Sequence, residues 1–158
     1  MIHTSRRTFL KGTLAGTMVG VAVGAGLLKP RAALADTWPK AAFEAKSVND
    51  ALKAMFGTDA HSASGDITIK APEIAENGAV VPITVSTKLS GVDSISIIAA
   101  ENPSPLTSSY DLAKNTEGYV STRIKMGKTS DVIAVVKSGD KLYSTSQQVK
   151  VTIGGCGG

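Results

Sequence analysis

The chain has 158 residues, of which 17 are Lys or Arg, 13 are Asp or Glu and one is Cys. Five of the basic residues and no acidic ones fall in residues 1–35, so residues 36–158 carry 17 − 5 = 12 basic and 13 acidic side chains and a net charge of −1. Because this remainder also has no Lys/Arg cluster interleaved with aromatic residues, the composition argues against nucleic acid as a partner.

Residues 1–35 have the order of parts found in an export signal. The pair Arg6-Arg7 resembles the twin-arginine consensus, an apolar stretch follows at 13–28, and a small-x-small tripeptide ends at Ala35. We expect cleavage between Ala35 and Asp36 and a periplasmic product. The alternative is a membrane anchor, but the stretch is rich in Gly and Ala and falls short of the roughly 20 apolar residues that span a bilayer. We therefore expect no membrane association after cleavage.

The segment after the leader predicts a short helical region. Apolar residues recur at spacings of three and four, which places them on one helix face. Ser47 and Asp50 fit a capping box, so the helix begins or restarts at Ser47, and Gly57 is the expected C-terminal residue. The apolar positions are Ala41, Ala45, Val48, Leu52 and Met55.

Beyond Gly57 the apolar period changes from about 3.6 residues to 2, which is typical of strands with one buried face. The continuous apolar run at 132–136 predicts a strand covered on both faces, and residues 138–140 predict a turn after it. A weaker strand is predicted at 106–112. The other strands are defined by Ile67 and Ile69; Val81, Ile83 and Val85; Ile95, Ile97 and Ala99; Val120, Thr122, Ile124 and Met126; and Val149, Val151 and Ile153.

Gly and Pro punctuate these strands. Asn77-Gly78 predicts a tight turn, although the residues before it leave room for a longer connection. Pro82 cannot donate a hydrogen bond to a sheet, so it predicts an edge strand or a bulge. Pro103 and Pro105 predict a stiff loop without regular pairing.

About seven short strands with little helix predict a mainly β fold, an antiparallel immunoglobulin-like β-sandwich. The domain organisation is then a cleaved signal peptide at 1–35, a sandwich domain with an N-terminal helical segment at 36–153, and a Gly-rich arm at 154–158. No antibody-type Cys…Trp…Cys pattern is present. Such a fold supports many functions and names none.

The terminal arm holds the single cysteine, Cys156, between two pairs of glycines: Gly154 and Gly155, and Gly157 and Gly158. Glycine loses more conformational freedom on ordering than any other residue, so we expect a flexible arm with an accessible thiol. A thiolate is the reactive form, and at an ordinary pKa of about 8.5 only a small fraction is ionised at neutral pH. Three interpretations follow: an incidental cysteine, an intermolecular disulfide, and a covalent carrier thiol.

Other chemistry finds little support in the sequence. His61 is the single histidine after the leader and lies in a polar stretch, where a solvated side chain is the expected role. Glu73 and Glu76 stand among turn residues, which again indicates solvated carboxylates. No nucleophile–base pair, metal-ligand spacing or phosphate-binding loop is apparent, so we expect no enzyme activity, no metal and no cofactor.

These features together resemble the SoxY family of sulfur carriers, which serve the periplasmic sulfur-oxidising (Sox) system. The resemblance rests on the twin-arginine leader, on the segments 101–105, 123–126 and 135–137, and most specifically on a terminal strand followed by Gly-Gly-Cys-Gly-Gly. It implies that Cys156 is the covalent attachment site for sulfur intermediates, as a thiosulfonate and then a persulfide. The protein would be a substrate carried on a swinging arm rather than an enzyme.

The resemblance also implies partners. A second immunoglobulin-like subunit, SoxZ, would form a heterodimer with the chain. A haem enzyme would conjugate thiosulfate, a manganese-dependent hydrolase would release sulfate, and a sulfur dehydrogenase would act in some organisms on the remaining sulfur. The alternative function is a structural periplasmic module that cross-links through an intermolecular disulfide at Cys156.

Overall fold

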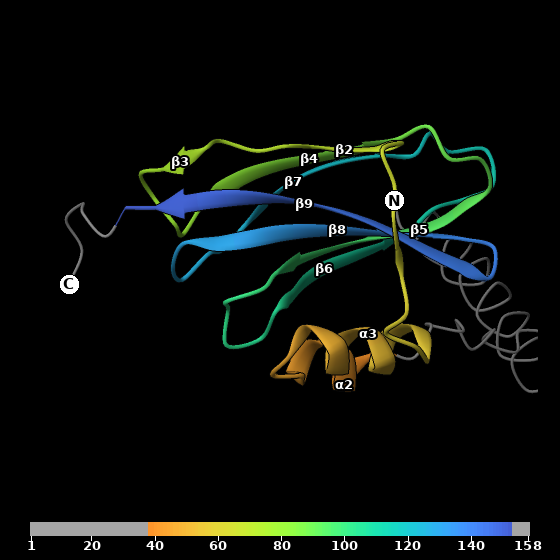
Figure 1. The fold of residues 1–158 in the computed structure, drawn as a ribbon, viewed down its shortest axis with the longest axis horizontal. Coiled ribbons are helices and arrows are strands. Elements are labelled where there is room, and N and C mark those ends of the chain that lie inside the picture. The colour runs from red at the N-terminus through yellow and green to blue at the C-terminus, as the bar shows by residue number, and fades with distance from the viewer. Residues whose placement is uncertain (1–37, 153–158) are drawn as a thin grey trace, which may run out of the picture. The chain divides into compact units, whose positions relative to one another are not determined.

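Two short helices precede the strands in the computed structural model, which describes residues 38–152 (Figure 1). Helix α2 spans Lys40–Glu44 and helix α3 spans Val48–Phe56. The side chain of Ser47 caps α3 by accepting a hydrogen bond from the Asp50 amide at 3.1 Å. Gly57 ends α3 with a left-handed φ of 77°, and its amide donates to the Lys53 carbonyl at 2.9 Å. The predicted restart at Ser47 and the predicted end at Gly57 are confirmed.

Nine strands follow within the described residues, and they form two sheets. The larger sheet has the order β1-β9-β8-β5-β6, with β3 also paired to β9, and the smaller sheet has the order β2-β4-β7. Their bounds are β1 Ser62–Ala63, β2 Ile67–Lys70, β3 Ile74–Ala75, β4 Val81–Thr87, β5 Val92–Ala99, β6 Leu106–Asp111, β7 Tyr119–Ile124, β8 Ser130–Ser138 and β9 Lys141–Val151.

The longer strands pair antiparallel, and the predicted antiparallel sandwich is confirmed. The two-residue strands β1 and β3 are the exceptions, because both run parallel to β9. They also account for the excess over the predicted seven strands, since two residues are too few to carry an alternating pattern.

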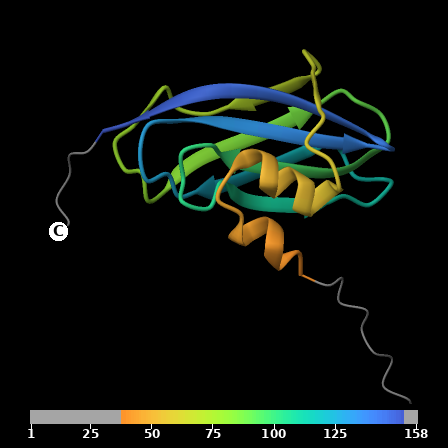
Figure 2. The ribbon, with the colours of Figure 1, turned by 60° about the horizontal axis from the view of Figure 1, so that its bottom comes forward.

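The main core lies between the two sheets. Strand β8 contributes Val132, Ala134 and Val136 to it, all fully buried. On the opposite face of the same strand, Val135 packs in a second cluster with Leu52 of α3. Figure 2 shows the helices lying against this outer face of the larger sheet. Strand β8 is therefore covered on both faces, as its continuous apolar run predicts.

The position of Pro82 differs from the prediction. Strand β4 is the middle strand of the smaller sheet and not an edge strand. However, β2 pairs only with residues 84–87 of β4, whereas Pro82 pairs with Arg123 of β7 alone. The proline thus occupies a stretch with one neighbour, where its missing amide proton breaks no ladder.

The last strand is longer than predicted. Apolar alternation marked its end at Val149 and Val151, but β9 begins at Lys141, directly after the turn, and pairs with β8 from Ser138 to Ser130. The predicted turn at 138–140 is confirmed, with Gly139 at a φ of 58°.

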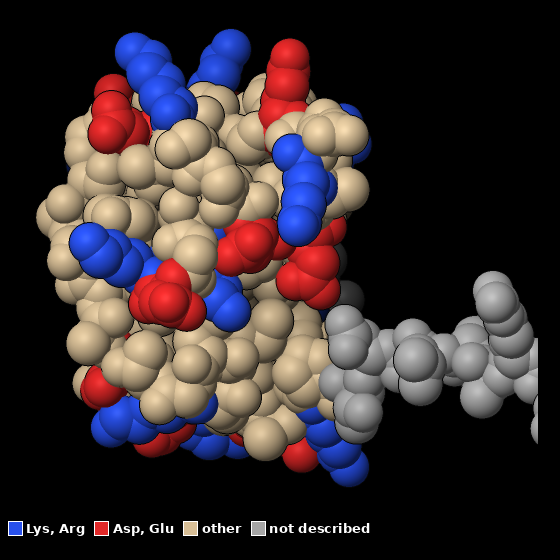
Figure 3. All heavy atoms as spheres, turned by 90° about the vertical axis from the view of Figure 1, so that its right-hand side faces the viewer, with Lys and Arg blue, Asp and Glu red and all other residues tan. Residues whose placement is uncertain are grey.

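Charges on the described surface are mixed in sign. Figure 3 views the end of the sandwich opposite the end of β9 and shows acidic and basic side chains interspersed. Within residues 38–152 no helix has the length and apolar character that crossing a bilayer requires.

Candidate functional site

The residues that the sequence singles out lie outside the described part of the chain. These are Cys156 and its glycines at 154, 155, 157 and 158, the motif pair Arg6 and Arg7, and the cleavage pair Ala35 and Asp36. The structure does describe the place from which the terminal segment leaves the domain, which is the end of β9 at Val151 and Thr152. This end of β9 is therefore the described part of the candidate site.

Three neighbours hold the end of β9. On one side β8 pairs Ser130 with Val149. On the other side β3 runs parallel, so that the Lys150 amide donates to the Glu73 carbonyl at 2.9 Å and the Thr152 amide donates to the Ala75 carbonyl at 3.2 Å. The pairing therefore continues to the last described residue.

A side-chain hydrogen bond adds to these main-chain bonds. The Val151 amide donates to Oγ1 of Thr129, which lies in the loop between β7 and β8, at 3.0 Å. The end of β9 is thus bonded to the β8 ladder, to β3 and to the β7–β8 loop.

The turn before β4 packs directly against Val151. The Gly78 carbonyl accepts a hydrogen bond from the Met126 amide at 2.7 Å. A Cβ at Gly78 would overlap the Met126 carbonyl oxygen and would lie 2.8 Å from Cγ1 of Val151. Glycine is required at position 78 because Met126 and Val151 lie too close to its backbone to leave room for a Cβ atom. The turn itself is fixed by Asn77, whose Oδ1 accepts from the Ala79 amide at 2.9 Å.

The loop that contains the two prolines braces the β7–β8 loop. The Asn102 side chain bonds to it twice, donating to the Lys125 carbonyl at 2.7 Å and accepting from the Gly127 amide at 3.0 Å. An ion pair of 3.1 Å joins Glu101 and Lys128 beside these bonds. The sequence predicts a stiff loop. In the structure this loop supports the β7–β8 loop, whose Thr129 accepts a hydrogen bond from the Val151 amide.

We call the segments 71–80, 100–105, 125–130 and 150–152 the β9 end. This surface carries no net charge, because its three acidic and three basic side chains, all exposed, balance one another. They are Glu73, Glu76, Glu101, Lys125, Lys128 and Lys150. We infer that this part of the domain offers no strong net field to a thiol that follows it.

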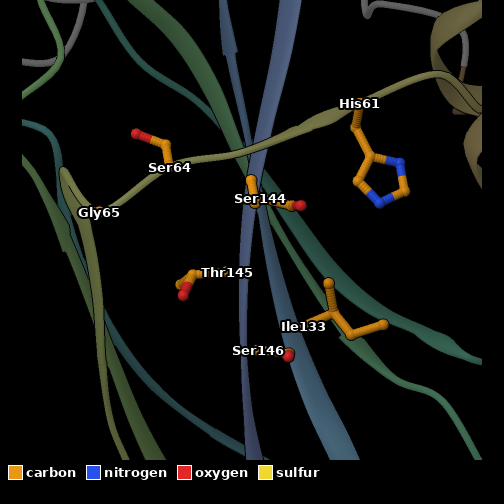
Figure 4. Close-up of a pocket in the computed structure, with 8 residues that line it drawn as sticks. His61, Ser64, Gly65, Ile133, Ser144, Thr145 and Ser146 are labelled. Atoms are coloured by element: carbon orange, nitrogen blue, oxygen red, sulfur yellow. The ribbon is translucent and has the colours of Figure 1, made fainter.

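An open groove lies elsewhere, over the first half of β9 (Figure 4). Its volume is about 510 Å³, and its lining is His61, Ala63, Ser64, Gly65, Ile133, Ser144, Thr145 and Ser146. Val151 lies five residues beyond this lining on β9, which at about 3.3 Å per residue places the groove roughly 17 Å from the end of the strand. The groove is therefore separate from the candidate site.

His61 at the rim of this groove is an exposed loop side chain, as the sequence predicts. Its Nδ1 lies 2.8 Å from the Asp59 carbonyl oxygen, and since a carbonyl only accepts, Nδ1 carries the proton of that bond. The ion pair of Asp59 with Lys53, at 3.2 Å, lowers the pKa of the Asp59 carboxyl. Across residues 38–152, the His, Cys, Asp and Glu side chains form no group of three suited to a metal ion.

Residues 52–156 match the family described as sulfur oxidation protein SoxY. The chain belongs to the SoxY family. The solved structure of the sulfur carrier protein SoxY from Chlorobium limicola f thiosulfatophilum is 46% identical, with a TM-score of 0.62, and the likeness covers 68% of this chain and 97% of that one. No curated protein shows a significant match. The SoxY match ends at Cys156, so it includes the predicted attachment residue.

Sequence reasoning missed the residues that hold the end of β9. Thr129 and Asn102 act through contacts between loops that are distant in the chain, and no local pattern marks such contacts. Gly78 was noticed as a turn residue, but its contact with Val151 has no signal in one sequence. The hydrogen bonds at Val151 and Thr152 fix the place where the segment that carries the thiol begins.

Proposed function

We propose that the protein is a periplasmic sulfur carrier, which binds thiosulfate-derived sulfur covalently on Cys156 and presents it to Sox enzymes. One observation carries the proposal: the SoxY match runs through residues 52–156 and so ends on the single cysteine of the chain. The related protein from Chlorobium limicola f thiosulfatophilum is itself a sulfur carrier. Export by the twin-arginine pathway, with cleavage after Ala35, is part of the same proposal.

The proposed chemistry begins with an oxidative conjugation. A sulfur–sulfur bond forms between Sγ of Cys156 and the terminal sulfur of thiosulfate, the thiol proton passes to solvent, and two electrons pass to a haem enzyme. The product is a cysteine S-thiosulfonate. Thiolate is the nucleophile in such a step, and no Lys, Arg or His lies within five residues of Cys156 in the sequence, so we assign its activation to the visiting enzyme.

The second step is hydrolytic. Water attacks the sulfonate sulfur, the bond between that sulfur and its sulfur neighbour breaks, and sulfate and a proton leave. A persulfide remains on Cys156. A manganese-dependent hydrolase supplies this step in the proposal, and a sulfur dehydrogenase is a further transient partner that acts on the persulfide. No electrons are exchanged in the hydrolysis.

In this proposal the folded domain supports the terminal segment that carries the thiol. The bonds to Glu73, Ala75 and Thr129 fix where that segment begins. A SoxZ-like subunit is the proposed permanent partner in a heterodimer, and export of folded protein would let both chains leave the cytoplasm together.

Intact-mass analysis of protein isolated from cells grown on thiosulfate tests the proposal. We expect thiosulfonate and persulfide adducts on the wild-type chain and none on a Cys156→Ser variant, which has no other thiol. The variant should unfold at the same urea concentration as the wild type, because the described core is built without residue 156.

The same measurement separates the alternative function. Wild-type protein without sulfur adducts would refute the carrier proposal. Disulfide-linked dimers in its place would favour a structural module that cross-links through Cys156. Retained thiosulfate turnover by Cys156→Ser in the reconstituted system would also refute the carrier role.

A further inference from the structure

The chain contains four asparagines, and they differ in the main-chain group that follows each of them. Asparagine is chemically labile, because its carboxamide carbon is open to attack by the main-chain nitrogen of the next residue. That attack needs a nitrogen that carries a removable proton and makes no hydrogen bond. The surroundings of the following amide therefore decide which asparagine reacts. The four are Asn49, Asn77, Asn102 and Asn115.

Three of the asparagines precede a group that is poorly suited to this attack. Asn102 is followed by a proline, which has no amide proton to lose. The amide after Asn49 donates to Oγ of Ser47 at 3.1 Å. The amide after Asn115 donates to the Ala113 carbonyl at 2.9 Å. Each of these two amides has to give up a hydrogen bond before its nitrogen can attack.

The Gly78 amide, which follows Asn77, is in a different state. Gly78 lies outside the helices and strands, and its amide donates no hydrogen bond within residues 38–152. Glycine also has no Cβ to obstruct the approach of its nitrogen to a neighbouring side chain. Asn77 itself is exposed, so solvent is available to accept the amide proton. Among the four asparagines, Asn77 is the one that a free amide follows.

The turn at Asn77 brings the two reacting atoms together. Oδ1 of Asn77 accepts a hydrogen bond from the Ala79 amide at 2.9 Å. The ring closed by this bond contains both the carboxamide carbon of Asn77 and the nitrogen of Gly78. A second bond, from the Val80 amide to the Asn77 carbonyl at 3.3 Å, closes the main-chain turn. The carboxamide is thus folded back toward the nitrogen that would attack it.

The bond from Ala79 also stabilises the charge that the reaction creates. When a nitrogen adds to a carboxamide carbon, negative charge develops on the carboxamide oxygen. The Ala79 amide already donates to that oxygen at 2.9 Å, within the range of about 2.7 to 3.1 Å over which a donor stabilises an oxyanion. Asn77 therefore combines a free nucleophile with an oxyanion donor that is already in place.

We propose that Asn77 is a site of spontaneous deamidation in the folded protein. The Gly78 amide loses its proton to solvent, its nitrogen bonds to Cγ of Asn77, and the bond from Cγ to Nδ2 breaks. Ammonia leaves with a proton taken from water, and a cyclic imide remains. Water then opens the imide at either carbonyl, which gives aspartate or isoaspartate at position 77, and no atom is oxidised or reduced. This inference does not depend on the carrier function.

Both products change the β9 end. Aspartate retains an acceptor for the Ala79 amide and adds a negative charge to a surface with three acidic and three basic side chains. Isoaspartate routes the main chain through the former side chain and so lengthens the backbone before Gly78. Gly78 has no room to shift, since even a Cβ there would overlap the Met126 carbonyl oxygen. The isoaspartate form should therefore unfold at a lower urea concentration than the aspartate form.

Incubation of the purified, folded protein at physiological temperature and several pH values tests the inference. Trypsin then releases two peptides that each contain a single asparagine, residues 71–88 with Asn77 and residues 115–123 with Asn115. Both side chains are exposed, so the second peptide is an internal control for the following amide. Mass spectrometry gives the acid content of each peptide, and chromatography separates aspartate from isoaspartate. Asn77→Ser, which keeps an acceptor for the Ala79 amide but has no carboxamide, is the matched variant.

We expect acid to form in 71–88 at least about tenfold faster than in 115–123, of which the hydrogen bond at the Thr116 amide accounts for about fivefold. The rate in 71–88 should rise with pH, because proton loss precedes the attack, and Asn77→Ser should form no acid there.

Equal rates in the two peptides would overturn the inference, as would acid formation in 71–88 of Asn77→Ser. Low concentrations of urea separate the folded from the unfolded reaction. A rate that grows in proportion to the unfolded fraction would also overturn the inference, because the reaction would then belong to the unfolded chain. Sulfur adducts on Cys156 are measured independently, so none of these outcomes alters the test of the carrier function.

Discussion

Gly78→Ala probes the packing that fixes the end of β9. The added methyl group would overlap the Met126 carbonyl oxygen, and its other contact, 2.8 Å from Cγ1 of Val151, is also too close. A side chain could rotate away, but the carbonyl belongs to backbone that Asn102 holds through the Lys125 carbonyl and the Gly127 amide.

The cost of this substitution follows from two contributions. Overpacking of a tight site costs about 1 to 3 kcal/mol. Displacement of the turn also weakens the 2.7 Å hydrogen bond from the Met126 amide to the Gly78 carbonyl, a bond worth about 1 kcal/mol. We therefore expect a loss of about 2 to 4 kcal/mol, or a fall in melting temperature on the order of 10 °C.

Urea unfolding followed by circular dichroism measures this loss, and Gly65→Ala is the matched control. A Cβ at Gly65 meets nothing within 4 Å, and its φ lies outside the left-handed region. The control should therefore be neutral or gain about 0.4 to 1 kcal/mol from a less free unfolded chain. Equal stabilities for the two alanine variants would refute the argument that Gly78 is needed for close approach.

Three further predictions concern the helix cap, the end of β9 and the arm. Ser47→Ala removes the acceptor of the Asp50 amide and should lower the free energy of unfolding by about 1 kcal/mol in urea titration, whereas Ser47→Asp should retain it. Thr129→Val removes the acceptor of the Val151 amide; hydrogen exchange at that amide should accelerate several-fold while Thr129→Ser stays near wild type, and equal exchange in both variants would contradict the assigned bond. Gly155→Pro fixes one φ between Thr152 and Cys156 and should slow conjugation several-fold with an unchanged unfolding midpoint, and unchanged conjugation would mean that backbone freedom at residue 155 is not required.

The sequence predicted most of the sandwich because strands such as β4 and β7 have one buried face. Period-2 alternation marks β4, β5 and β7, and their inward side chains are buried where the pattern places them. Strand β5 is buried on its other face as well, at Ser94, Ser96 and Ile98. Strand β9 was shortened in the prediction because residues 144–148 are all polar. The tight turn at 138–140 implied a partner strand of equal length, and that hairpin argument would have extended β9 to Lys141.

The candidate site was predictable only at its reactive residue. Cys156 stands out by composition alone, as the single thiol of a chain with a predicted export signal and with glycines on both sides of it. The contacts that hold the base of its segment depend on loops 20 to 80 residues apart in sequence, such as Val151 with Thr129 and Thr152 with Ala75. Strand β3 shows the limit most clearly, because a two-residue parallel pairing leaves no local pattern.

The parallel pairing of β3 with the last residues of β9 has a mechanical consequence. In the proposed carrier, an enzyme that draws on the terminal segment would apply force along the axis of β9. Strand β9 is hydrogen-bonded along one side to β8 over nine residue pairs and at its end to β3 on the other side. An axial pull loads these bonds together, in shear, rather than opening them one after another as a sideways peel would. The last strand is thus suited to bear tension along its axis.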